Sequence, residues 1–356
     1  MSTPRKAGTE AARAPDASKP VAGPKARSAA SPAGKARPAG KSGTAQKGGA
    51  VGRTPAARPT PPAPGPSLVV GPVPVLARVA GATALAGAVL LLVAQAFPLA
   101  RSDGRDLGGA GNVLGFLPVL PLVAVVAAAA VLLLRGSLPR LGLAALLSAG
   151  TLAAGPGLRT LALLDDGAST TVDLPLGIAT SARYEAAPGL VLLALAYGLL
   201  VLAAVLAAAA WPRTLMEDDG DFDPRRPRLA AWGLTVGGLA AIVVGMAPCA
   251  STTALVPPAV PERSGLDLLG GLVLALGTLV WAVVAATLRP RLAVAGAYAG
   301  VAAVLLAEGL AIALLVVRSP ALQPSMGGVG TLLAGLAMLA LAWVAAPVRG
   351  LPRRAG

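Results

Sequence analysis

From residue 75 onward, the sequence is a succession of apolar runs separated by short segments rich in Arg, Pro and Gly. Most runs have about 20 residues, and an α-helix of that length crosses the ~30 Å hydrocarbon core of a bilayer. Backbone N–H and C=O groups in that core must be bonded within the protein, which favours helices over irregular segments. The sequence therefore predicts an all-α polytopic membrane protein.

Eight runs are long enough to be predicted as transmembrane helices. They lie at about 76–98, 114–134, 141–163, 188–211, 229–249, 267–288, 292–317 and 327–347. The run at 114–134 is the weakest of them, because Pro118 and Pro121 stand near its start. Seven spans, or a re-entrant second segment, are the alternatives.

Composition agrees with a membrane protein and excludes several chemistries. Charged residues make up 13% of the chain, about half of the ~25% that is typical of soluble domains. There is no His and one Cys, Cys249. Sites that need His or several Cys, such as zinc centres and Ser-His-Asp triads, cannot be built. We therefore expect no metal, no cofactor and no intrachain disulfide.

A basic, Ala/Pro/Lys-rich tail precedes the first apolar run. Residues 1–74 hold twelve cationic side chains, including every lysine of the protein, against Glu10 and Asp16. With so little apolar surface to bury, we expect this tail to be disordered. Anionic lipid headgroups are its expected partner. Nucleic acid is not expected, because the tail has no aromatic side chain to stack on bases. The alternative is a solvated tail that only helps to set orientation.

The arginines indicate how the chain crosses the membrane. If the tail is cytoplasmic, 24 of the 30 cationic residues fall on the cytoplasmic side of an eight-span arrangement. Positive charge accumulates on that side in membrane proteins. We therefore expect a multi-pass protein of a bacterial plasma membrane, with both termini in the cytoplasm.

The second half of the membrane region resembles the first. Arg78 and Arg228 open the first and fifth runs, and Pro98 and Pro248 end them, each pair separated by 150 positions. Pro139 falls on Pro290 with nearly the same offset. Ala- and Leu-rich helices align readily with one another, so the matching Arg and Pro positions are the stronger argument for an internal repeat.

The repeat divides the chain into segments. We expect two four-helix halves, 75–211 and 229–349, joined by a charged cytoplasmic loop at 212–228 and followed by a short basic tail at 350–356. Four spans in each half give both halves the same orientation in the membrane.

Glu308 is an acid in the middle of the apolar run 301–317. An acid near the bilayer centre costs at least ~2.5–3.5 kcal/mol on insertion scales, so Glu308 must be paired, hydrated or protonated. Carrying the repeat forward aligns Glu308 with Pro156, and Arg159 then lies less than one helical turn away in depth. We therefore predict a contact between Arg159 and Glu308.

The segment that aligns with Glu308 reads Gly155-Pro156-Gly157. Proline removes a helical N–H, so the third span is predicted to kink or break here and to open a cavity. The candidate intramembrane binding site therefore comprises Glu308, Arg159, Gly155, Pro156 and Gly157. A structural ion pair is the alternative.

Two further patterns are weaker. The Gly-x-x-x-Gly pairs Gly233/Gly237 and Gly296/Gly300 are interpreted as helix-packing surfaces and not as a dimer interface. The outer loop at 165–187 contains an alternating stretch that predicts a short strand or a segment lying on the bundle.

These features leave two functions open. The basic tail and the scarcity of polar residues in the spans predict a non-enzymatic scaffold, assembly or accessory protein, with another membrane or cytoplasmic protein as a further partner. The repeat, the proline in the third span and Glu308 favour the alternative, a carrier of a small apolar or amphiphilic solute that is coupled to protonation of Glu308. An enzyme is not expected, because the spans offer one buried carboxyl and no second group to act with it.

Overall fold

In the computed structural model, the described residues are 69–346, with gaps at 103–104, 109–112, 167–168, 175–177, 218–225, 247–248, 252–264, 290 and 319–321. They all belong to one compact unit, residues 62–356. The predicted tail up to residue 68 and the C-terminal segment from residue 347 lie outside the described residues.

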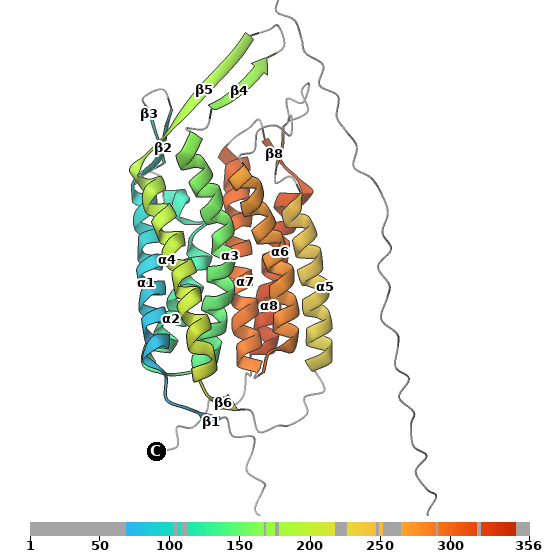
Figure 1. The fold of residues 1–356 in the computed structure, drawn as a ribbon. Helices are drawn as coiled ribbons and strands as arrows, with labels where there is room; N and C mark the ends of the chain where they lie inside the picture. Colours follow the sequence, from blue (N-terminus) through green and yellow to red (C-terminus); the bar gives the residue numbers. More distant parts are fainter. Residues whose placement is uncertain are drawn as a thin grey trace, which may run out of the picture. The chain divides into compact units, whose positions relative to one another are not determined.

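Eight α-helices make up most of the described structure and run up and down in alternation (Figure 1). They are α1 (Val75–Ala96), α2 (Leu120–Arg135), α3 (Pro139–Asp166), α4 (Pro188–Ala210), α5 (Arg226–Gly245), α6 (Gly265–Thr287), α7 (Arg291–Arg318) and α8 (Met326–Ala345). Two 3-10 helices, η1 (Val113–Phe116) and η2 (Trp211–Arg213), precede α2 and follow α4. Each predicted span overlaps one α-helix.

Seven of these helices are long and apolar enough to cross a membrane, so the chain is a multi-pass membrane protein. The exception, α2, has 16 residues, about 24 Å of helix. The prediction of a full span at 114–134 is wrong at its start, because η1 and a turn precede Leu120. Pro121 lies in the first turn of α2, where its missing N–H would have no helical partner in any case.

The helices α3 and α7 form the centre of the bundle. α3 packs against α2, α4, α6 and α7, and α7 packs against α2, α3, α6 and α8. At the periphery, α1 packs on α2 and α4, while α5 packs on α6 and α8. Accordingly 72% of the α3 span is buried inside the protein, against 17% of the α5 span. The buried side chains are mainly Ala and Leu, and the small ones let helices approach closely.

The Gly-x-x-x-Gly pairs lie on these contact surfaces. A Cβ added at Gly296 or Gly300 of α7 would collide with α3. Gly233 and Gly237 of α5 lie against α7 and α6 in the same way. Their interpretation as packing motifs is confirmed.

Short strands lie at both ends of the bundle, whereas the sequence predicted an all-α fold with one short strand within 165–187. They are β1 (Val69–Val70), β2 (Pro98–Ser102), β3 (Arg105–Gly108), β4 (Ser169–Leu174), β5 (Ile178–Ala186), β6 (Met216–Glu217), β7 (Cys249–Ser251) and β8 (Leu322–Pro324). At one end, β3, β2, β5 and β4 form an antiparallel sheet in that order, and β7 pairs with β8. The strand predicted within 165–187 is thus confirmed as part of a hairpin.

At the other end, the chain just before α1 pairs with the loop after α4. Val69 lies opposite Glu217 and Val70 opposite Met216 in an antiparallel pair. The N–H of Gly71 continues this pairing by donating to the Leu215 carbonyl over 3.1 Å. The last residues of the tail, predicted to be disordered up to residue 74, therefore have a defined structure.

Candidate intramembrane binding site

Arg159 of α3 and Glu308 of α7 are in contact, as the sequence predicted. The Nη1 atom of Arg159 donates a hydrogen bond to Oε2 of Glu308 over 3.2 Å. The Glu308 side chain is 19% exposed and the Arg159 side chain 31% exposed. Both are largely covered by protein, where the local dielectric is lower and a charge pair is stronger than in water.

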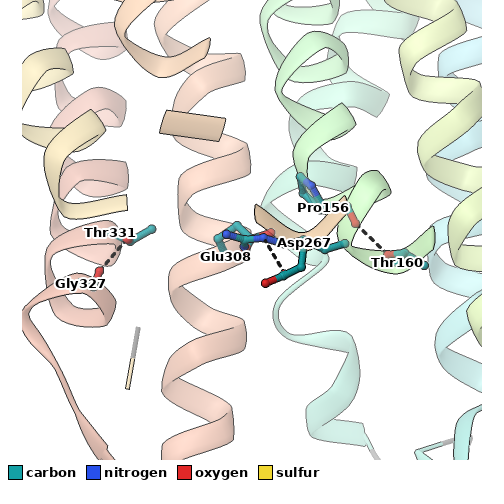
Figure 2. A network of polar contacts seen from close by, with 7 residues as sticks. Pro156, Thr160, Asp267, Glu308, Gly327 and Thr331 are labelled. Carbon is teal, nitrogen blue, oxygen red and sulfur yellow. Dashed lines mark hydrogen bonds and ion pairs between the residues drawn. The ribbon is translucent and has the colours of Figure 1, made fainter. Parts of the chain in front are cut away.

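A second acid, Asp267 of α6, belongs to the same cluster and was missed by the sequence analysis. Its Oδ1 atom lies 3.6 Å from Nε of Arg159. Figure 2 shows Asp267 and Glu308 close together, with Pro156 and Thr160 of α3 beside them. A signal for this residue existed, because Asp267 and Glu308 are the only acids within the eight predicted spans. That signal is weak, because Asp267 stands at the edge of its span.

The approach of α3 to α6 brings Asp267 within reach of Arg159. At Gly155, an added Cβ would lie 2.8 Å from the Gly270 carbonyl oxygen. At Gly270, it would lie 2.6 Å from the Gly155 carbonyl oxygen and 2.9 Å from Cγ of Arg159. Real Cβ atoms do not come so close to a carbonyl oxygen, so both positions require glycine for this packing.

The predicted break at Pro156 is wrong. α3 continues as one helix from Pro139 to Asp166 with Pro156 inside it. The Leu152 carbonyl loses the N–H that a non-proline residue at 156 would supply. Neighbouring helices packed on both sides of a buried helix allow it to continue through a proline. The Thr160 hydroxyl donates to the Pro156 carbonyl over 2.8 Å, so that carbonyl has an additional partner.

A groove of about 390 Å³ lies beside Glu308, between α7 and the first four helices. The α7 residues that line it recur at helical spacing and are Val304, Ala307, Glu308, Ala311, Leu314, Leu315 and Arg318. The facing wall consists of Gln95, Leu99, Gly115, Pro118, Val119, Leu122, Pro156, Leu193 and Tyr197. The groove lies beside the start of α2, because Gly115, Pro118 and Val119, which precede that helix, line it together with Leu122.

Three of the five predicted site residues lie at or beside the groove. Glu308 and Pro156 line it, and Arg159 contacts Glu308. Gly155 faces α6 instead, and Gly157 lies against Tyr197 of α4. The groove thus lies beside the start of α2, and α3 is unbroken where Pro156 lines it.

The polar groups at the groove are few. Gln95, Tyr197, Glu308 and Arg318 are the lining residues with polar side chains, and none of the lining residues is Ser, Thr or Cys. Within the part of the chain that the structure describes, no three acidic or Cys residues are grouped so as to hold a metal ion. The groove can thus offer an apolar surface, a carboxyl group and hydrogen-bonding groups to a ligand.

Comparison with known proteins does not point to a function. The chain matches no protein-family model, no curated protein and no solved structure. Function must therefore be argued from the geometry of this site.

Proposed function

We propose that this protein is a non-enzymatic carrier that binds an apolar or amphiphilic small molecule in the α7 groove, with transport coupled to protonation of Glu308. The observation that carries the proposal is the groove of about 390 Å³ that reaches Glu308. Small-molecule sites are of this size and combine apolar walls with a few polar groups. Ionisable residues inside membrane helices mark ligand and proton pathways.

The composition of the groove supports an apolar or amphiphilic ligand. Its walls are mostly Leu, Val, Ala and Pro, with four polar side chains in all. A highly polar solute would leave its hydrogen-bonding groups without partners there, at a cost of ~1–3 kcal/mol for each group.

The helix contacts support two tandem four-helix repeats. In the first half, α1 packs on α2 and α4, and α3 packs on the same two helices. In the second half, α5 and α7 each pack on α6 and α8. Between the halves, α3 packs on α7. In addition, α3 packs on α6 of the second half, and α7 packs in the equivalent way on α2 of the first half. This pattern is expected of a pseudo-two-fold axis between α3 and α7, and many carriers move one repeat against the other.

The distribution of arginine supports an eight-span arrangement in a bacterial plasma membrane, with both termini in the cytoplasm. Eight described arginines lie at the end of the bundle where α1 begins, namely Arg78, Arg135, Arg140, Arg213, Arg226, Arg228, Arg289 and Arg291. This end is assigned to the cytoplasm by the positive-inside rule. We propose that these arginines and the basic tail hold anionic lipid headgroups.

The test is saturable binding of radiolabelled decanol by the purified protein in phosphatidylcholine nanodiscs, with empty nanodiscs as the blank. Ala311→Trp fills the groove, whereas Ala313→Trp places the same bulk on α7 outside the groove lining. We expect saturable binding in the wild type and in Ala313→Trp, and none in Ala311→Trp. Binding that does not saturate, or that Ala311→Trp leaves unchanged, would rule the proposal out.

A scaffold or accessory protein is the second candidate, and the low burial of α5 and α6 favours it. Only 17% of the α5 span and 28% of the α6 span are buried within the chain. Exposed side chains on these helices include Trp232, Leu239 and Ile242, which would suit a partner helix as well as lipid. This candidate predicts that a membrane protein co-purifies with the chain and that changing Trp232 and Ile242 to Ala abolishes this co-purification. That result, together with no binding of decanol, would favour the scaffold over the carrier.

A further inference from the structure

We propose that the α7 groove selects amphiphiles whose headgroup both donates and accepts a hydrogen bond, such as a hydroxyl or a primary amide, and that the side-chain amide of Gln95 binds this headgroup. This inference rests on the proposed function, because it assumes that the groove binds an amphiphile. It adds the chemistry of the headgroup and assigns Gln95 as the residue that recognises it.

Gln95 is a buried polar residue without a partner in the protein. It lies in the last turn of α1, lines the groove and is only 8% exposed. Its amide offers one carbonyl acceptor and two N–H donors. Among the described residues, no hydrogen bond joins this side chain to another group. A buried polar group without a partner costs ~1–3 kcal/mol, so a ligand in the groove that bonds to this amide removes a cost of the ligand-free protein.

Gln95 lies nearer the outer end of the groove than Tyr197 does. A Cβ added at Gly189 of α4 would lie 2.9 Å from the Ala94 carbonyl oxygen and 2.8 Å from the Phe97 carbonyl oxygen. Gly189 is therefore level with Gln95, which stands between those two residues of the chain. Tyr197 follows Gly189 by eight residues on α4, about 12 Å along the helix axis. The two polar side chains of this wall are thus separated in depth.

The walls between Gln95 and Tyr197 suit an alkyl chain. Leu193 stands midway between the two depths on α4, and the α7 wall contributes Ala311 and Leu315. Leu315 is 50% exposed, so the groove reaches the surface of the bundle, where lipid surrounds a membrane protein. An amphiphile bonded to Gln95 would point its chain inward along these walls, with its headgroup toward the outer face, as lipids of the outer leaflet do.

The amide of Gln95 distinguishes headgroups by their hydrogen bonds. A hydroxyl or a primary amide can bond to both the carbonyl and the N–H of this side chain, since each has a donor and an acceptor. A headgroup without a donor leaves the Gln95 carbonyl without a partner. Sites that hydrogen-bond a hydroxyl reject analogues that lack it, because the buried polar groups of the site are then left unpaired.

The experiment compares decanol, decanamide and 1-fluorodecane, which has nearly the shape of decanol but no hydrogen-bond donor. Each competes with radiolabelled decanol for the full-length protein in phosphatidylcholine nanodiscs, and each affinity is expressed relative to the probe concentration in the nanodisc lipid. We expect decanol and decanamide to bind at least five-fold more tightly than 1-fluorodecane. Equal affinity of the three probes, or tighter binding of 1-fluorodecane, would overturn the inference but leave the carrier proposal intact. Absence of saturable decanol binding would overturn both.

Gln95→Leu removes the amide and keeps a side chain of similar bulk. We expect it to lower the affinity for decanol and decanamide at least five-fold and to leave the affinity for 1-fluorodecane unchanged. Gln323→Leu makes the same change at an exposed residue of β8 and is the matched control that keeps the preference. A preference for decanol and decanamide that survives Gln95→Leu would contradict the assignment of Gln95.

The stability of the ligand-free protein separates recognition from a structural role. Because the Gln95 amide has no hydrogen-bond partner among the described residues, its replacement by an apolar side chain breaks no bond. We therefore expect Gln95→Leu without ligand to have a Tm no lower than that of the wild type. A Tm lower by several degrees, or loss of the folded state, would show that the amide is bonded within the protein and would overturn the inference.

Discussion

Arg159 and Glu308 are separated by 149 positions in the chain and meet through a hydrogen bond of 3.2 Å between α3 and α7. Asp267 of α6 lies on the other side of the same guanidinium, at 3.6 Å. One cation therefore connects three helices that belong to both halves of the bundle. This arrangement determines how each partner should respond when another is removed.

The two ends of this pair should differ in their contribution to stability. Arg159→Leu removes the cation that Glu308 and Asp267 share, so we expect it to lower the free energy of unfolding by about 1–3 kcal/mol, less than the ~3–5 kcal/mol of a fully buried pair. Glu308→Gln leaves Arg159 with Asp267 and should cost less than about 1 kcal/mol. Thermal unfolding in a mild detergent measures both. A larger loss for Glu308→Gln than for Arg159→Leu would contradict the shared pairing.

Glu308 should react with a hydrophobic carbodiimide, which attacks only a protonated carboxyl group in an apolar place. Since the proposed carrier protonates Glu308 during transport, we expect labelling of wild-type Glu308 near pH 7 that rises as the pH falls from 9 to 5. Asp267→Asn should slow the reaction, because Arg159 then has only Glu308 as a partner. Mass spectrometry of the labelled peptide gives the rates.

One labelling result would rule out the carrier proposal. If wild-type Glu308 is not labelled near neutral pH, and labelling appears only in Arg159→Leu, the pair is static. Glu308 would then be a structural residue that joins α3 to α7.

The contact of α3 with α6 should depend on the lack of a side chain at Gly270. In Gly270→Ala the new Cβ would meet the Gly155 carbonyl oxygen at 2.6 Å, so α6 must move away, at a cost of about 1–3 kcal/mol. Gly265→Ala is the matched control on the same helix, because a Cβ there has no neighbour within 4 Å. We expect a lower Tm in Gly270→Ala alone. Equal Tm values for the two variants would show that the helices are not packed as described.

The orientation of the chain can be tested with its single thiol. Cys249 begins β7, which pairs with β8 between α7 and α8, at the end assigned to the outside. A membrane-impermeant maleimide added to intact cells should label Cys249. In a Cys249→Ala background, Ser137→Cys places the single thiol in the turn between α2 and α3, at the opposite end. This thiol should be labelled only after lysis. Labelling of the position-137 thiol in intact cells would reverse the orientation.

Much of the fold follows from local patterns in the sequence. Apolar runs of membrane length predict helices because lipid offers no hydrogen bonds to the backbone, and each predicted span overlaps an α-helix. The run at 114–134 shows the limit of this argument, because hydropathy alone does not reveal that the helix begins only at Leu120. The start of this helix lies beside the α7 groove, which Val119 and Leu122 help to line.

The candidate site was predicted only in part. Glu308 is conspicuous as an acid among apolar residues, and the internal repeat brought Arg159 to its depth. The repeat could not reveal Asp267, since the close approach of α3 to α6 depends on the tertiary packing of Gly155 on Gly270. The prediction of a break at Pro156 was wrong, because a proline does not break a buried helix when neighbouring helices pack on both of its sides.

The most direct test of the central claim is to map where an amphiphile binds. The purified protein in nanodiscs is irradiated with a photoactivatable decyl probe, and the modified residues are identified by mass spectrometry. We predict modification of the α7 stripe from Ala307 to Leu315 and of Leu193 or Tyr197 on the facing wall, lost in Ala311→Trp and kept in Ala313→Trp. Modification spread over the lipid-facing sides of α5 and α6, and unchanged by Ala311→Trp, would contradict the existence of a ligand site in this groove.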